Sequence, residues 1–233
     1  MNIENKARKF YDCFNKVKRL RKYDHPVVKA HVIDKINFIK ENIELSKTTK
    51  VLEVGAGNGY FSHYLEDSCD LLATDVNKET LTLNPTKNKK VCDVNKLPFK
   101  NNSFDVVTSF DILHHVNNPE RAVKEITRVS KKYVVLVEPN GDNIIQRAIF
   151  LPVPREWGIN RFTTKYFKNI IKKNRLKILE FEHIGRLFTP NMPLPYAFIK
   201  KMPYSKSSQL NFHNIAICVK ERAFDRKSKE QDL

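Results

Sequence analysis

The stretch VLEVGAGNGYFS, residues 51–62, constrains the fold of this chain more than any other segment. It begins as an apolar strand interrupted only by Glu53, and three glycines then follow at every second position. Glycine lets the backbone turn back sharply and brings unshielded amides close to a bound molecule. In a parallel sheet, ligands bind beyond the carboxyl ends of the strands, where the strand order reverses. The stretch therefore predicts a cofactor-binding turn after the first strand of an α/β sheet.

The rest of the chain alternates strand-like and helix-like segments, which favours a doubly wound, mostly parallel sheet of seven strands with a Rossmann-like arrangement. Helices are expected from residue 27 to about 43, from Pro119 to Val129, and after a Thr163 cap. The last two strands are expected to form a hairpin that leaves the last strand antiparallel, because no long crossover helix separates them. Beyond the first strand, strands are expected at residues 71–75, 89–93, 103–110, 133–138, 176–184 and 214–221.

We expect a single domain over residues 1–233, since this length suffices for one continuous core. An amphipathic helix is expected to begin near Ile3. The expected parts are an N-terminal helical cap (1–45), a core (46–184 and 212–221), a substrate-side insert between the last two strands (185–211) and a mobile tail (222–233).

The chain of 233 residues carries a net charge of +16 that is unevenly distributed. Lys and Arg number 13 against 6 Asp and Glu in residues 1–50, 11 against 12 in residues 51–140, and 18 against 8 in residues 141–233. Basic flanks around a neutral centre indicate an anionic partner such as RNA, lipid headgroups or an anionic substrate. Lysine-rich, solvated surfaces without a partner are the alternative interpretation.

The sequence also bears on location and metal content. No apolar run is long enough to span a bilayer, and the first residues lack the apolar block of a secretory signal. The four cysteines form no CxxC pair, so neither a zinc site nor a disulfide framework is indicated. We expect a cytoplasmic protein that holds no metal, with peripheral contact to an anionic membrane as an alternative. The sequence does not indicate an oligomeric state.

Details of the glycine turn distinguish between the cofactors that it can bind. The dinucleotide fingerprint requires GxGxxG, whereas this chain has GxGxG followed by Tyr60. A buried carboxylate at Glu53 needs a partner, and an ammonium group provides one that NAD lacks. Asp75 ends the second strand, where it can accept both hydroxyls of a ribose. A helix expected to begin near Asn58 would direct free N–H groups toward a carboxylate. Together these features favour S-adenosylmethionine over NAD.

Four ordered blocks resemble the class I S-adenosylmethionine-dependent methyltransferases, and most of all their small-molecule branch, the methyltransferase-11 type. The blocks are VLEVGAGNGYFS, ATDVN, VCDVNKLPFKNNSFDVVTSFDILHHVNNP and VVLVEPNG. They cover residues 50–141, and residues 161–184 and the final strand fit the family more loosely. The glycine turn alone is a weak signal, but the ordered set at these spacings is specific.

The resemblance implies a role for each residue of the cofactor site. These residues are Glu53, Gly55, Gly57 and Gly59 for the methionine portion and its turn, Asp75 and Val76 for the ribose and the adenine face, Asp93 and Val94 for the adenine edge, and Phe110 for the methyl-transfer chamber. Two of them have simpler interpretations. The alternative to ribose binding is that Asp75 is a turn residue at a strand end. The alternative to adenine binding is that Asp93 caps the LPF turn that follows it.

The candidate catalytic residues are those that could accept a proton. A hydroxyl or thiol acceptor must lose its proton during methyl transfer, and the candidates for this role are His114, His115 and Glu138. The resemblance implies that a His-His pair is common at this place in the family, with a role that varies. Packing or hydrogen bonding within the loop is therefore the alternative for both histidines.

Residues 144–162 are expected to lie on the substrate side, because they combine apolar, aromatic and basic side chains. Arg147, Arg155, Trp157 and Arg161 are the candidates to bind an amphiphile with an anionic head. Alternatively, the apolar residues form a lid over the cofactor and the arginines form its rim.

The sequence thus predicts methyl transfer from S-adenosylmethionine, by in-line displacement, to a small or lipid-linked anionic acceptor. An RNA methyltransferase is the alternative, favoured by charge alone, because the chain shows no RRM-like or KH-like pattern. A non-catalytic cofactor-binding module is a third possibility, and the intact Glu53, Asp75 and Asp93 argue against it.

Overall fold

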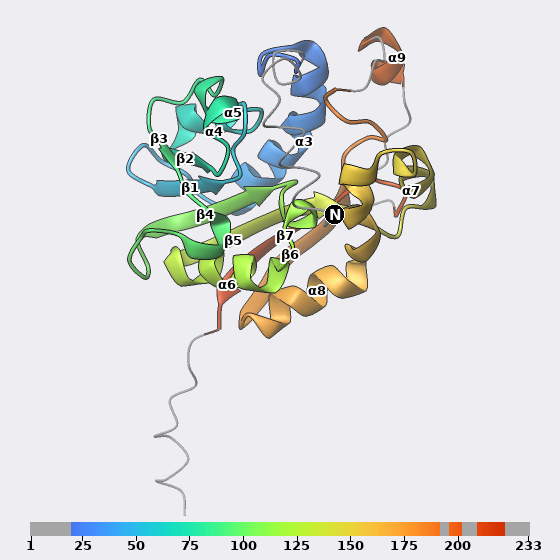
Figure 1. Cartoon of the computed structure of the whole chain (residues 1–233). Helices are drawn as coiled ribbons and strands as arrows, with labels where there is room; N and C mark the ends of the chain where they lie inside the picture. The colour runs from blue at the N-terminus through green and yellow to red at the C-terminus, as the bar shows by residue number, and fades with distance from the viewer. Residues whose placement is uncertain (1–19, 192–195, 202–208, 222–233) are drawn as a thin grey trace, which may run out of the picture.

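A seven-stranded sheet forms the centre of the computed structural model, which describes residues 20–191, 196–201 and 209–221 (Figure 1). The strand order is β3-β2-β1-β4-β5-β7-β6. All neighbouring strands are parallel except β7, which is antiparallel to both β5 and β6. The expected sheet with an antiparallel last strand is confirmed. The strands are β1 (Lys50–Val54), β2 (Asp70–Asp75), β3 (Lys89–Val91), β4 (Phe104–Phe110), β5 (Ser130–Pro139), β6 (Leu176–Ile184) and β7 (His213–Lys220).

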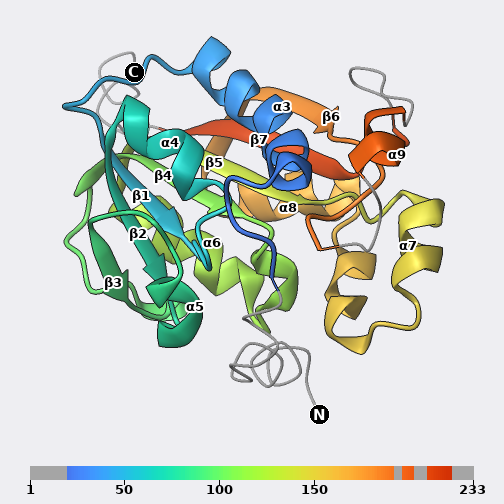
Figure 2. The ribbon, with the colours of Figure 1, turned by 90° about the horizontal axis from the view of Figure 1, so that it is seen from above.

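Helices cover both faces of the sheet. Figures 1 and 2 place α3 and α4 on one face, with α6 and α8 on the other. The helices are α3 (Pro26–Asn42), α4 (Ser62–Leu65), α5 (Lys78–Thr82), α6 (Pro119–Val129), α7 (Ile144–Phe150), α8 (Thr164–Lys173) and α9 (Tyr196–Lys201). Short 3₁₀ segments are η1 (Glu66–Ser68), η2 (Val94–Lys96), η3 (Leu113–His115) and η4 (Pro154–Arg161).

The central strand β5 shows how the sequence divides the core between these two layers. Val134 and Leu136 belong to the apolar cluster that contains the buried side chains of α6 and α8. Val135 and Val137, on the opposite face, belong to the cluster that contains those of α3. All four side chains are fully buried. A nearly continuous apolar run is what a strand covered on both faces requires.

Side-chain caps mark two helix starts, at Asn118 and at the predicted Thr163. The Asn118 side chain accepts a hydrogen bond from Arg121 N at 3.0 Å, just before Pro119 opens α6. Thr163 Oγ1 accepts one from Tyr166 N at 3.2 Å at the start of α8. A side-chain oxygen at this position satisfies an N–H that the first helical turn leaves without a partner. The local sequence therefore sets where both helices begin.

The helix expected to begin near Asn58 is a wrong prediction, because α4 begins only at Ser62 and is one turn long. Gly57 and Gly59 have φ angles of +49° and +88°, which a right-handed helix excludes. The third strand also ends earlier than expected, at Val91, because Asp93 caps η2 instead of continuing the strand.

Several expectations fall on residues that the structure does not describe. The amphipathic helix near Ile3 and the tail 222–233 lie outside the described residues, as do positions 192–195 and 202–208 of the expected insert. Within the described ranges, the insert contains α9. No helix there combines the length and the apolar character needed to cross a bilayer.

Candidate active site

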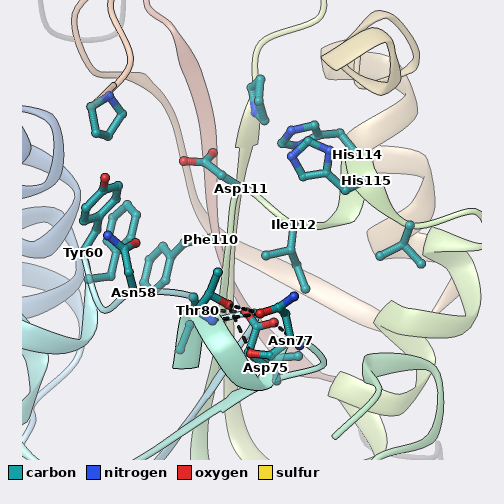
Figure 3. Close-up of a pocket in the computed structure, with 18 of the residues that line it drawn as sticks. Asn58, Tyr60, Asp75, Asn77, Thr80, Phe110, Asp111, Ile112, His114 and His115 are labelled. Atoms are coloured by element: carbon teal, nitrogen blue, oxygen red, sulfur yellow. Dashed lines mark hydrogen bonds between the residues drawn. The ribbon is translucent and has the colours of Figure 1, made fainter. Parts of the chain in front are cut away.

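A cavity of about 370 Å³ lies at the carboxyl ends of β1, β2 and β4 (Figure 3). β1 pairs with β2 on one side and with β4 on the other, so the strand order reverses at this point. This is the position at which α/β sheets bind their ligands. The glycine turn, the ends of β2 and β4, and parts of α7 and η4 line the cavity.

The glycine turn depends on all three of its glycines. Gly55, Gly57 and Gly59 have φ angles of +76°, +49° and +88°, a region that other residues enter only with strain. A Cβ on Gly55 would lie 2.1 Å from Cγ2 of Ile112, so the turn packs tightly against the loop after β4. The spacing recognised in the sequence is therefore a steric requirement of this turn.

The Asp75 side chain joins the glycine turn to the end of β2. Its Oδ2 accepts a hydrogen bond from Gly57 N at 2.8 Å, and its Oδ1 accepts one from Asn77 N at 2.8 Å. Burial raises the pKa of Asp75, while these N–H donors act in the opposite direction. Val76 follows with 48% of its surface exposed, and it lines the cavity as an apolar surface beside the carboxylate.

Glu53 lies at the centre of a buried network beneath the turn. Its Oε2 accepts a hydrogen bond of 2.5 Å from Ser62 Oγ, which in turn accepts one from Asn84 Nδ2 at 2.8 Å. Burial raises the pKa of Glu53 to about 8. The sequence indicated the buried carboxylate but not its partners, because Ser62 and Asn84 carry no local motif.

The remaining predicted cofactor residues also line the cavity. Asp93 Oδ1 accepts from Asn95 N at 2.8 Å, so this carboxylate does cap the following turn, and Val94 is the first residue of η2. Phe110 stacks on Phe61 with ring centroids 4.0 Å apart and planes 3° from parallel. Both sides of the β1–β4 junction therefore contribute to the cavity wall.

The three candidate proton acceptors occupy one buried array. Glu138 Oε2 contacts His114 Nδ1 at 2.7 Å, and Glu156 Oε2 lies 3.4 Å from His114 Nε2 on the other side of the ring. Burial alone would lower the pKa of His114, but these carboxylates outweigh it and raise the pKa to about 10. Burial and the His114 charge lower the pKa of His115 to about 4. His114 is therefore held as a cation, and His115 is held neutral.

Glu138 is not among the residues that line the cavity. It is fully buried, and its two oxygens accept hydrogen bonds from the backbone N–H groups of Ile112, Leu113 and His114. This arrangement makes Glu138 a positioning residue for the loop after β4.

The four predicted substrate-side residues do not lie together in the cavity. Arg155 lines it, next to Glu156, with which it forms an ion pair of 3.0 Å. Arg161 is directed toward the carbonyl oxygens of residues 113, 114 and 116. Arg147 donates to Asn160 Oδ1 and Trp157 donates to Leu151 O. Only Arg155 is placed to meet a molecule inside the cavity.

Sequence patterns did not indicate that three further cavity residues lie together. His31 on α3, Asp111 after β4 and His213 at the start of β7 converge on one another, and all three line the cavity. Figure 3 shows the Asp111 carboxylate directed away from the strand end and into the site. Asp111 also has a φ angle of +55°, which is rare for a residue other than glycine.

Comparison with known proteins agrees with this site. Residues 52–137 match the family model described as a methyltransferase domain. The chain is 31% identical over 122 residues to the uncharacterized protein MJ0638 of Methanocaldococcus jannaschii. This alignment covers 51% of this chain and 53% of that protein. It is 34% identical over 93 residues to a phosphatidylethanolamine N-methyltransferase of Cereibacter sphaeroides, covering 36% of this chain and 46% of that protein. The chain thus spans about half the length of these relatives.

The fold is shared with solved structures. A Thermotoga maritima protein, described as a SAM-dependent methyltransferase and possible histamine N-methyltransferase, superposes with a TM-score of 0.63 and 18% identity, over 84% of this chain and 92% of that one. Residues 52–137 thus match a methyltransferase domain, and the chain shares its fold with solved S-adenosylmethionine-dependent methyltransferases. Both findings agree with the methyltransferase resemblance that the sequence showed.

Glu53 predicts a measurable dependence of stability on pH. Because burial raises its folded-state pKa from 4.5 to about 8, the folded protein binds this proton more tightly than the unfolded chain. The contribution to stability is therefore complete below pH 4.5 and is lost as the pH rises to about 8, on the order of 5 kcal/mol in total. Urea unfolding should show that the free energy of unfolding of Glu53→Gln falls less steeply between pH 5 and pH 8 than that of the wild type. Parallel pH profiles for the two proteins would contradict this account.

Proposed function

We propose that this protein transfers a methyl group from S-adenosylmethionine to a small or lipid-linked anionic acceptor. The observation that carries the proposal is a pair of carboxylates, the fully buried Glu53 and the half-buried Asp75, on either side of a glycine turn that opens into the cavity. An ammonium group beside Glu53 would favour the ionised form of this carboxyl against the burial that raises its pKa. A carboxylate at the end of β2 suits the ribose of the cofactor.

The proposed roles follow the cavity wall. Glu53, Gly55 and Gly57 bind the methionine portion, while Gly59 keeps the turn in shape. Asp75 binds the ribose hydroxyls, and the exposed Val76 side chain packs on the adenine. Asp93 and the Val94 backbone bind the adenine edge, and Phe110 borders the place where the methyl group is transferred. Each of these residues lines the cavity except Gly59, whose φ of +88° shapes the turn.

The cofactor, when bound, supplies an activated methyl group on a sulfonium centre. The protein then has to align the acceptor and exclude water, and alignment of this kind is worth about 7–11 kcal/mol in favourable cases. Glu138 and His114 support this alignment by fixing the loop that carries Asp111 and Ile112. Because His114 is held as a cation between two carboxylates, it is not suited to accept a proton, and His115 is the better placed of the pair.

An exposed apolar face beside the cavity supports a lipid-linked acceptor. Ile144 and Leu151 are 72% and 69% exposed, and Ile145, Ile149 and Trp157 are exposed nearby. Gln146 and Phe150, on the same helix, line the cavity, so the face continues into the site. Figures 1 and 2 place α9, with its exposed Phe198, on the same side of the molecule as α7. We call the α7 part of this surface, residues 144–157, the α7 face.

Calorimetric titration tests the cofactor. We expect S-adenosylmethionine, but not NAD, to release heat with the wild type. Asp75→Ala and Asp75→Asn should each weaken binding at least tenfold, because hydrogen bonds to a charged acceptor are worth about 1.5–3 kcal/mol each. Asp70→Ala, at the exposed start of the same strand, is the matched control and should bind like the wild type. Heat from NAD without heat from S-adenosylmethionine would overturn the proposal.

Vesicle co-sedimentation tests the α7 face. We expect binding to vesicles of phosphatidylglycerol and phosphatidylcholine, stronger than to phosphatidylcholine alone because the protein is basic. The double variant Ile144→Ser and Leu151→Ser should bind at least tenfold more weakly, since burying each apolar side chain contributes about 1.5–3 kcal/mol. Leu179→Ser, which changes an exposed leucine on β6, is the control. Equal binding by all three proteins would remove the support for a lipid-linked acceptor.

RNA is the alternative acceptor, supported by the basic flanks alone. A cell extract incubated with the protein and methyl-labelled cofactor, then separated into lipid, RNA, protein and small-molecule fractions, distinguishes the two. We expect label in the lipid or small-molecule fraction. Label in RNA, together with RNA binding that weakens steeply as salt rises, would favour the alternative. Cofactor binding without label in any fraction would favour a non-catalytic module.

A further inference from the structure

We propose that His31, Asp111 and His213 form a binding site for a first-row divalent metal ion in the wall of the cavity. The three residues come from α3, the end of β4 and the start of β7, and the fold brings them together at the sheet's carboxyl edge. Both histidine side chains are almost fully buried, whereas the Asp111 side chain is 27% exposed, on the cavity side.

The distances between the ligand atoms suit one shared ion. Nε2 of His31 lies 3.6 Å from Oδ2 of Asp111, and Nε2 of His213 lies 3.2 Å from Oδ1 of the same carboxylate. One ligand atom from each residue can be chosen so that all three lie within 4.8 Å of one another. Ligand atoms bound at about 2.0–2.2 Å to one ion are themselves separated by about 3–3.6 Å. Only small side-chain adjustments are therefore needed to bind an ion.

The hydrogen bonding of the cluster is incomplete without an ion. His213 Nδ1 is buried and has no hydrogen-bond partner among the described residues, and Asp111 Oδ1 has none with hydrogen-bond geometry, although His213 Nε2 lies 3.2 Å from it. Buried polar atoms are nearly always paired, so each exception calls for an explanation. An ion between the two histidines would provide a partner for Asp111 Oδ1. The Asp111 backbone is left-handed, at φ +55°, a conformation that is costly for a residue other than glycine and that the surrounding structure must maintain.

The protonation states of the two histidines agree with this geometry. Burial lowers the pKa of His31 to about 3 and that of His213 to about 4, which favours neutral imidazoles. Neutral imidazole and ionised carboxylate are the forms that bind metals.

Lys35 is a further charged group in this region, and Asp34 is near enough to act on its pKa. The fully buried Lys35 ammonium donates to His31 O at 2.7 Å. A Cβ on Gly185 would lie 3.1 Å from Lys35 Nζ and 3.2 Å from His213 Nδ1, so both atoms border Gly185. His213 Nε2 lies beside Asp111 Oδ1, at 3.2 Å. Since His213 Nδ1 lacks an acceptor to orient the ring, we expect micromolar rather than nanomolar affinity.

A second cluster, His114, His115 and Glu156, also has three potential ligand atoms close together. Its charges are already balanced within the protein. His114 is held as a cation by Glu138 and Glu156, and Glu156 also pairs with Arg155. A protonated imidazole cannot bind a metal. We therefore expect no ion at this cluster and use it as the control for the first cluster.

The donor set also indicates the metal and its use. Two imidazoles and one carboxylate suit Zn²⁺, Fe²⁺, Co²⁺ or Mn²⁺ and leave coordination positions open. If the proposed methyl transfer holds, those positions would bind a hydroxyl oxygen of the acceptor and lower its pKa. The hydroxyl proton then leaves to solvent, the oxygen forms its bond to the methyl carbon, and the sulfur keeps the electron pair of the broken bond. The acceptor class would accordingly be a hydroxyl compound.

Titration with Co²⁺, followed by its visible absorption, tests the site without cofactor, so its outcome is independent of the S-adenosylmethionine titration. We expect one equivalent to bind the wild type with bands of a nitrogen- and oxygen-coordinated ion. His213→Gln and Asp111→Asn should each weaken binding at least tenfold. His115→Gln, in the second cluster, and His63→Gln, outside the cavity wall, are the controls and should bind as the wild type does.

Thermal unfolding by circular dichroism establishes that each variant is folded. If His213→Gln does not fold, Asp111→Asn decides the outcome, and X-ray absorption of the Co²⁺-loaded wild type reports whether two imidazoles coordinate the ion. The proposal is overturned if the wild type binds no Co²⁺ below millimolar concentration. It is also overturned if His115→Gln abolishes binding while Asp111→Asn preserves it.

Discussion

The geometry of the site depends on one buried carboxylate, Glu138, near the end of β5. Its oxygens accept hydrogen bonds from three successive backbone N–H groups, those of Ile112, Leu113 and His114, and contact the His114 ring at 2.7 Å. Removing this carboxylate would leave several buried donors without partners, and each such donor costs about 1–3 kcal/mol. The loop after β4 is therefore held in place by the neighbouring strand rather than by its own sequence.

That loop connects the two halves of the cavity. Ile112 packs against Gly55, so the position of the loop also sets the glycine turn that we assign to the cofactor. Asp111, which precedes Ile112 in this loop, has a left-handed backbone conformation. Its carboxylate contacts His31 and His213. The hydrogen bonds of Glu138 thus fix the glycine turn and the proposed metal site relative to each other.

The features that the sequence predicted are those that depend on local patterns. The mostly parallel sheet follows from alternating strand-like and helix-like segments, and the turn follows from three glycines that adopt positive φ angles. The same φ angles override the helical pattern near Asn58, which is why α4 starts late. Contacts between distant segments could not be predicted: His31 and His213 have no local signal, and Arg161, expected to meet substrate, is directed toward backbone carbonyls instead. The cysteine spacing indicates no metal site, and a cluster of histidine and carboxylate side chains from distant segments leaves no local signal in the sequence.

The central claim is that the glycine turn binds S-adenosylmethionine. Native mass spectrometry of the protein, incubated with equal amounts of S-adenosylmethionine and NAD, tests it most directly. The account predicts a 1:1 complex with S-adenosylmethionine, or with the demethylated product carried through purification, and no complex with NAD. A complex with NAD alone would contradict it.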